Sequence, residues 1–293
     1  MLSNWLRAIR VRFLLASVIA VSSGLAIGYW KYHHIDPLYA VFTYLGVGFL
    51  HASVDLLNDY WDYKRGIDSA TTRTKFSGGT GVLPENMLTP KAVYAAGLIF
   101  LILGALVGIY FVFLRGITIA IILGFAVIAI YFYSTSIVNA GLGELFVAIK
   151  GTMIVLGTFY VQTARLDPSA VYVGAIIGIL SATVLLVNSF PDFDADRSKG
   201  RRTLIIILGK KRAAMTLLPL FIGFVYAMII AGVFMGYTKI YSLVSLTSFP
   251  FAVNSILLLR KDQENLKGLL PAMSSAVTYS RVTGALLAIS LLF

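Results

Sequence analysis

The stretch Asn58–Asp68, which reads Asn-Asp-Tyr-Trp-Asp-Tyr-Lys-Arg-Gly-Ile-Asp, decides how this chain is organised. It follows an apolar segment that begins near Leu38. A second stretch, Asn188–Asp196 (Asn-Ser-Phe-Pro-Asp-Phe-Asp-Ala-Asp), follows another apolar segment. Seven of the 13 acidic residues lie in or just before these two stretches: Asp55, Asp59, Asp62, Asp68, Asp192, Asp194 and Asp196. In a chain so poor in acids, this concentration predicts a chemical role.

The composition predicts an all-α integral membrane protein. The 293 residues are 58% hydrophobic and 13% charged, with a mean hydropathy of +0.86, whereas soluble domains average about 25% charged residues. We expect one domain over residues 1–293, and the first helix to be retained because eight further spans follow it. The spans, each of roughly 20 residues, are predicted at 13–30, 38–57, 92–114, 117–133, 142–163, 170–190, 213–235, 240–259 and 270–292.

The net charge of +11 and the pI near 9.8 do not indicate nucleic-acid binding. The basic residues lie in the loops between spans, which the positive-inside rule explains. The chain has no cysteine, so disulfides, thiol catalysis and cysteine-bound metals are excluded.

The same rule predicts the orientation. With the N-terminus inside, the inside segments hold 18 Lys and Arg residues and the outside segments hold four. This bias predicts a multi-pass protein of the cell membrane with a cytoplasmic N-terminus. Both long polar loops, 58–91 and 191–212, then face the cytoplasm, so their acidic residues can share one site.

The spacing of the acids predicts a metal site. Asn58 and Asp62 are four residues apart, as are Asn188, Asp192 and Asp196, and residues so spaced share one face of a helix. Oxygen ligands without His or Cys favour Mg²⁺, with Mn²⁺ as the alternative. The loops add cations that suit a diphosphate on an apolar tail: Lys64, Arg65, Arg73, Lys75, Arg197, Lys199, Arg201 and Arg202. The competing interpretation is that acids and bases pair in solvated loops.

The two motifs resemble those of the UbiA superfamily of intramembrane aromatic prenyltransferases. The first family motif, Asn-Asp-x-x-Asp with a further Asp, is matched by Asn58, Asp59, Asp62 and Asp68. Placement of that further acid at Asp68, beyond Gly66, resembles the 1,4-dihydroxy-2-naphthoate branch, which acts in the menaquinone pathway. The second motif is matched by Asp192, Asp196 and Arg197, with Gly200 and Arg202-Thr203-Leu204 after them. Weaker similarities are Arg10-Val11-Arg12, Tyr133-Ser134 and Gly141–Glu144.

The resemblance, which covers nearly the whole chain, implies nine helices around a central prenyl-binding cavity. Two Mg²⁺ ions would hold a prenyl diphosphate, its ionisation would give an allylic cation, and an aromatic ring would attack that cation. The metal residues would be Asn58, Asp59, Asp62, Asp192 and Asp196. The substrate-binding residues would be Arg10, Arg12, Lys64, Arg65, Lys75, Asn188, Lys199 and Arg202. Asp68 would orient or deprotonate the acceptor, while Tyr133 and Ser134 would shield the cation or contact the diphosphate.

Several alternatives stay open. The acceptor could be another quinone precursor, a glycerol phosphate or a porphyrin, because the motifs recognise only the diphosphate. A cation-coupled transporter predicts acids deep within spans, whereas these lie at helix ends. The sequence leaves the prenyl chain length, decarboxylation, the oligomeric state and the roles of Glu144, Lys150 and Arg281 undetermined.

Overall fold

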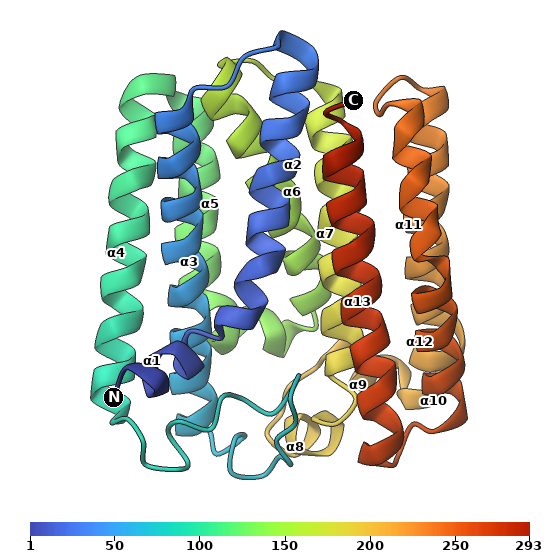
Figure 1. Cartoon of the computed structure of the whole chain (residues 1–293). Coiled ribbons are helices and arrows are strands. Elements are labelled where there is room, and N and C mark those ends of the chain that lie inside the picture. Colours follow the sequence, from blue (N-terminus) through green and yellow to red (C-terminus); the bar gives the residue numbers. More distant parts are fainter.

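The computed structural model describes residues 1–293 as helices joined by turns and loops (Figure 1). The first half contains α1 (Leu2–Ala8), η1 (Val11–Phe13), α2 (Leu14–Tyr32), α3 (Pro37–Lys64), α4 (Pro90–Arg115), α5 (Ile117–Phe132), η2 (Tyr133–Ile137) and η3 (Val138–Ala140). The second half contains α6 (Gly143–Thr163), α7 (Pro168–Asn188), α8 (Phe193–Ser198), α9 (Leu204–Leu208), α10 (Lys210–Arg212), η4 (Ala213–Leu217), α11 (Leu218–Phe234), η5 (Ile240–Ser248), α12 (Phe249–Lys261) and α13 (Leu266–Ser290).

The long helices stand side by side as one bundle, which confirms the predicted all-α membrane architecture (Figure 1). Eight helical segments are long and apolar enough to cross a membrane. The ninth predicted span corresponds to α13, a 25-residue helix that runs alongside the others but is not among those eight. It carries Lys267 and Arg281 together with several serines and threonines, which lower its hydropathy.

The outer surface of the bundle is apolar where a lipid-facing surface is expected. Only 22% of the apolar stretch of α4 is buried inside the protein. For the segment that begins with α5, 22% of the apolar stretch is likewise buried. Ile102 and Phe113 of α4 and Ile121 of α5 are exposed. A helix that is apolar all round and covered on one side only is stable in hydrocarbon, where its backbone hydrogen bonds are satisfied internally.

Three long helices begin with the same local device. Asp36, Thr89 and Asp167 each accept a hydrogen bond from a backbone N–H of the first turn of α3, α4 and α7, respectively. In each case a proline follows at the first helical position, where its missing N–H costs nothing.

Glycines allow α6 and α7 to approach closely. A Cβ added to Gly178 of α7 would overlap the carbonyl oxygen of Ala148 in α6, and one added to Gly151 would lie 2.5 Å from the Cα of Gly178. In a membrane, where no hydrophobic effect drives helices together, such close backbone contact supplies the packing energy.

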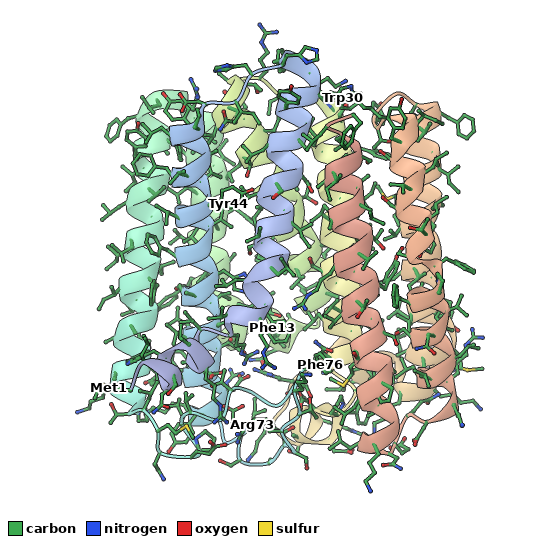
Figure 2. The ribbon with its side chains drawn as sticks, viewed as in Figure 1. Met1, Phe13, Trp30, Tyr44, Arg73 and Phe76 are labelled. Atoms are coloured by element: carbon green, nitrogen blue, oxygen red, sulfur yellow. The ribbon has the colours of Figure 1, made fainter.

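Both acidic stretches lie at the same end of the bundle. That end also holds the N-terminus, α1, α8, α9 and the loop between α3 and α4 (Figure 1). Figure 2 shows Phe13 of η1 and Phe76 of that loop at the level where the loop meets the bundle, and both line the cavity described below.

The structure corrects one expectation about the second stretch. Asn188, Asp192 and Asp196 do not follow one continuous helix, because α7 ends at Asn188 and α8 begins at Phe193. Pro191 lies in the turn between them. Proline has no N–H to donate and disfavours helical backbone in the residue before it, so the chain turns here.

The contact between α6 and α7 can be tested by adding a methyl group. We expect Gly178→Ala to destabilise the folded protein by about 1–3 kcal/mol, because it overpacks a backbone contact. Gly223→Ala in α11 is the matched control, since a Cβ there meets nothing within 4 Å. Thermal unfolding in detergent measures both. Equal midpoints for the two variants would show that the close approach contributes nothing.

Candidate active site

The two acidic stretches line one cavity of about 310 Å³ at the loop end of the bundle. Its polar wall includes predicted site residues from both halves of the chain: Arg10, Asn58, Asp62, Tyr133, Asn188, Asp192 and Asp196. Its remaining wall includes Phe13, Val54, Ile130, Phe146, Val147, Ile154 and Val277. The cavity therefore joins a charged end to an apolar interior.

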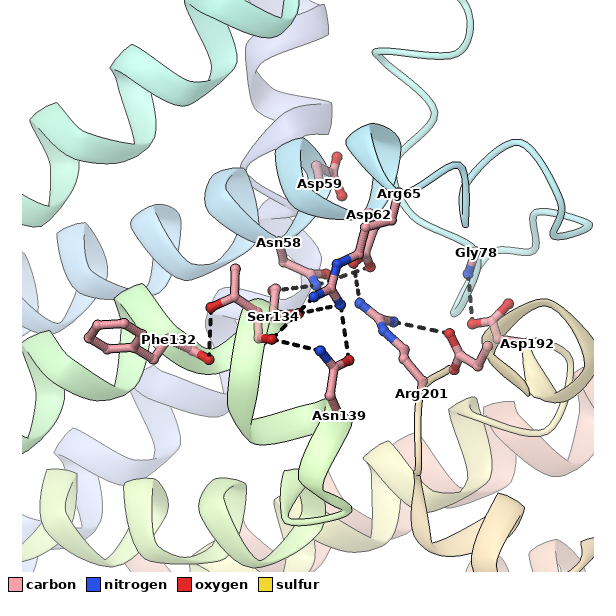
Figure 3. Close-up of polar contacts among 12 residues, drawn as sticks. Asn58, Asp59, Asp62, Arg65, Gly78, Phe132, Ser134, Asn139, Asp192 and Arg201 are labelled. Atoms are coloured by element: carbon pink, nitrogen blue, oxygen red, sulfur yellow. Dashed lines mark hydrogen bonds and ion pairs between the residues drawn. The ribbon is translucent and has the colours of Figure 1, made fainter. Parts of the chain in front are cut away.

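A buried arginine joins the two motifs. The guanidinium of Arg201 pairs with Asp62 from α3 and, at 3.1 Å, with Oδ1 of Asp196 from α8 (Figure 3). Its side chain is only 9% exposed. Carboxylates from two distant parts of the sequence thus share one positive charge, which offsets the cost of burying them.

Burial makes the carboxyl groups of the second motif harder to ionise than exposed ones. Burial raises the pKa of Asp196 to about 6, against the lowering effect of the Arg201 charge. Burial also raises the pKa of Asp192. Groups in this state gain most from a nearby cation, because an opposite charge restores the ionised form.

The loop after α3 holds Asp192 in place. The hydroxyl of Thr71 donates to Oδ1 of Asp192, and the backbone N–H of Gly78 donates to Oδ2 at 3.1 Å (Figure 3). Gly78 has a φ of +79°, which glycine adopts without strain. The loop of the first motif therefore positions an acid of the second.

A π-helical turn carries Tyr133 and Ser134 to the site. Asn58 donates to Ser134 Oγ at 2.9 Å and to Asp62 Oδ2 at 3.1 Å. Arg65 donates to the carbonyl oxygens of Ser134 and Thr135 and to Asn139 (Figure 3). These hydrogen bonds from Arg65 hold the π-helical turn against the end of α3.

Asp59 points away from the other acids. Its Oδ1 accepts a hydrogen bond from Arg10 Nη2 at 2.7 Å and its Oδ2 accepts one from the Thr80 hydroxyl. It is almost fully buried and is not part of the cavity wall. The structure therefore separates Asp59, predicted as a metal residue, from Asp62.

Asp68 is buried against the loop beside the cavity. A Cβ added to Gly79 would lie 2.6 Å from Oδ1 of Asp68, so glycine is required for this approach, and Gly79 itself lines the cavity. Burial, followed by the negative charges of Asp62 and Asp59, raises the pKa of Asp68 to about 8.

Apart from Arg10, the basic residues that the resemblance implies for substrate binding lie outside the cavity wall. The exposed ones are Arg12, Lys64, Lys75, Lys199 and Arg202. The side chain of Lys199 lies close to Gly66, with its Nζ 3.5 Å from the position that a Cβ would occupy. Arg10 lines the cavity.

Arg201 lines the cavity, whereas its neighbour Arg202, which the resemblance implies as a substrate-binding residue, does not. Both were recognised as loop cations, but the adjacent arginines carry no sequence signal that separates them. Thr71 and Gly78 were not recognised either. Their role depends on how the loop folds back across the bundle.

The donors at the cavity end fit a hard divalent cation. Carboxylate and amide oxygens from both motifs face the same space, and Oδ1 of Asn188 is buried without a hydrogen-bond partner. No three acids or histidines lie close enough to hold one ion in this arrangement, and Arg201 pairs with both Asp62 and Asp196.

The chain belongs to the UbiA prenyltransferase family, whose sequence profile matches residues 17–275. It is therefore a prenyltransferase and a multi-pass membrane protein. It is similar to the 1,4-dihydroxy-2-naphthoate octaprenyltransferases of Escherichia coli (strain K12) and Bacillus subtilis (strain 168). The first is 27% identical, with 97% of this chain and 91% of the relative covered. The second is also 27% identical, with 97% and 90% covered.

A solved structure shows the same fold. A UbiA homolog from Archaeoglobus fulgidus, bound to DMAPP and Mg²⁺, superposes with a TM-score of 0.66 over 98% of this chain and 99% of that chain. The two sequences are 17% identical, so the likeness concerns the fold.

The role of Arg65 can be tested against its neighbour. We expect Arg65→Met to lower both thermal stability and turnover, because hydrogen bonds from a charged group contribute about 1.5–3 kcal/mol each and hold the turn that carries Ser134. Lys64→Met should leave both nearly unchanged, since Lys64 is exposed. Unfolding midpoints and initial rates measure the two variants, and indistinguishable variants would contradict the role given to Arg65.

Proposed function

We propose that the protein transfers a prenyl group from a prenyl diphosphate to 1,4-dihydroxy-2-naphthoate in a Mg²⁺-dependent reaction. The observation that carries this proposal is the meeting of Asp62, Asp192 and Asp196 at the mouth of one cavity with an apolar interior. The naphthoate is chosen as acceptor because curated relatives similar over almost the whole chain carry that activity in their names.

Asn58, Asp62, Asp192 and Asp196 would hold two Mg²⁺ ions. When bound, these ions neutralise the diphosphate and stabilise its charge as the allylic C–O bond breaks. The electron pair of that bond leaves with the diphosphate. A ring carbon of the acceptor then forms the new C–C bond, and the ring loses a proton or its carboxyl group.

Arg201 is the cation best placed for the leaving diphosphate. It pairs with Asp62 and Asp196, and a guanidinium at this position would be within reach of the phosphate oxygens of a diphosphate held by those carboxylates and Mg²⁺. Arginine suits this because its planar group binds phosphate through two hydrogen bonds. Arg10 lines the same end.

Asp68, Tyr133 and Ser134 would serve the acceptor side. We propose that Asp68 orients the acceptor or removes its proton. Tyr133 lines the cavity. Its aromatic ring would attract the allylic cation and would shield that cation from water. Ser134, which accepts a hydrogen bond from Asn58, would hold the adjacent part of the cavity wall in position.

We further propose that the loop end faces the cytoplasm in the cell membrane. The excess of Lys and Arg in the loops at this end supports that orientation. Water-soluble substrates and products would then enter and leave from the cytoplasm, while the prenyl tail lies within the bundle.

The activity can be tested directly on purified protein in nanodiscs. A prenyl diphosphate and 1,4-dihydroxy-2-naphthoate should yield a prenylated naphthalene product and diphosphate, identified by mass spectrometry, only when Mg²⁺ is present. A glycerol phosphate, a porphyrin and other quinone precursors serve as competing acceptors. Faster transfer to one of these would replace the proposed acceptor, and turnover in excess chelator would refute the metal dependence.

Two aspartates of the second motif provide a matched test of the metal residues. We expect Asp192→Asn to lower turnover about a hundredfold or more, since metal-based charge stabilisation amounts to several kcal/mol. Asp194→Asn should leave turnover within about twofold, because the Asp194 side chain is 86% exposed. Initial rates over a Mg²⁺ titration measure the effect, and an active Asp192→Asn would remove that residue from the metal site.

The raised pKa of Asp68 gives a pH test. Because this pKa is about 8, the group is mainly protonated at neutral pH and becomes a base as the pH rises. We expect turnover to increase by about tenfold per pH unit well below 8 and then to level off. Asp68→Asn should be slow and lack this increase. A variant with the wild-type pH profile would show that Asp68 is not the base.

A further inference from the structure

A second polar group lies in the cavity wall beyond the residues assigned above. It consists of Ser17 of α2, His51 and Asp55 of α3, and Lys150 of α6. All four lie within membrane-spanning helices. Ionisable residues at such depth are costly and mark functional positions.

This group lies deeper in the bundle than the metal-binding end. His51 precedes Asn58 by seven residues on α3, and Lys150 follows Gly143, the first residue of α6, by seven. A helix rises 1.5 Å per residue, so each lies roughly 10 Å further into the bundle. Because α3 ends and α6 begins at the loop end (Figure 1), both residues reach a similar depth.

Lys150 has no ion-pair partner within 4 Å among the side chains of the protein. Its side chain and that of Asp55 line the same cavity. An ammonium group that is neither paired nor hydrogen-bonded is expensive in an apolar bundle. The cavity between Lys150 and Asp55 can therefore accept a ligand that binds both.

The opposite side of this subsite is built from hydrogen-bonding groups. His51 Nδ1 lies 2.6 Å from the hydroxyl of Ser17, and His51 Nε2 lies 3.4 Å from Oδ2 of Asp55. That Asp55 oxygen is buried and has no hydrogen-bond partner. It can accept a hydrogen bond from a ligand hydroxyl, while Lys150 supplies a positive charge for an anionic group.

We propose that Lys150 and Asp55 form the acceptor subsite and recognise an aromatic hydroxy-carboxylic acid. The ligand carboxylate binds the Lys150 ammonium, and a phenolic hydroxyl donates to Asp55. This inference rests on the proposed function and extends it by naming the residues that select the acceptor. Charge-assisted hydrogen bonds of this kind are strong because the surroundings are dry.

The other two ligands of the reaction fit this subsite poorly. A prenyl tail offers nothing to an ammonium group, and an allylic cation beside Lys150 would be destabilised by like charge. The diphosphate is accounted for at the loop end, which along the helices is about 10 Å from the level of Lys150 and about 4.5 Å from Asp55. An acceptor that spans the two layers instead brings its ring towards the bond that breaks.

The test compares two acceptors that differ only in the carboxylate: 1,4-dihydroxy-2-naphthoate and 1,4-naphthalenediol. In wild type, the naphthoate should have the lower KM by about tenfold or more. Lys150→Met should raise the KM of the naphthoate by about ten- to a hundredfold and leave that of the diol within about twofold. Lys150→Arg should keep most of the selectivity, and the KM for prenyl diphosphate should not change in either variant.

Each other outcome contradicts the inference. Equal losses with both acceptors would show a structural role for Lys150, and no loss would show that it does not touch the acceptor. Equal KM values in wild type would overturn the subsite even if Lys150→Met failed to fold. Calorimetric titration of the naphthoate into wild-type protein and Lys150→Met measures binding without turnover. It therefore separates failure of this inference from failure of the proposed reaction, which a wild type inactive with every aromatic acceptor would show.

Discussion

Neutralisation of buried carboxylates is the constraint on which the loop end of this protein depends. Asp62, Asp192 and Asp196 come together at the edge of an apolar bundle, where isolated negative charges are costly. The guanidinium of Arg201 lies between Asp62 and Asp196 and offsets part of that cost. The same carboxylates are the groups that we propose hold the metal ions of the reaction.

The loops at this end are folded by the same acids. Asp192 accepts hydrogen bonds from Thr71 and Gly78, and Asp59 accepts them from Arg10 and Thr80. Asp59 of the first motif thus holds the N-terminal segment and the loop, while Asp62 of the same motif lines the cavity. Structural and chemical roles are divided within one motif because Arg10 and Thr80 pack against Asp59, whereas Asp62 lines the cavity.

The cavity combines charged groups at its mouth with a mostly apolar interior. Because polar groups are few in that interior, those present there indicate a function. An apolar wall suits a prenyl tail and keeps water away from a reactive cation. Lys150 and Asp55 interrupt that wall, and we propose that they bind the polar groups of the acceptor. Because an unpaired charge is costly at this depth in the membrane, Lys150 and Asp55 would favour a polar ligand over an apolar one.

The sequence by itself determined the membrane class, the nine helical segments and the pairing of two acidic motifs. Hydropathy and spacing are local properties, and the excess of loop cations at one end already implied a shared site. It could not separate Arg201 from Arg202, turn Asp59 away from Asp62, or show the break at Pro191 between Asn188 and Asp192. Lys150 was visible in the sequence, but its relation to Asp55 was not. These features were decided only by tertiary structure, because the direction of a side chain at a helix end depends on how loops and helices from distant parts of the chain pack around it.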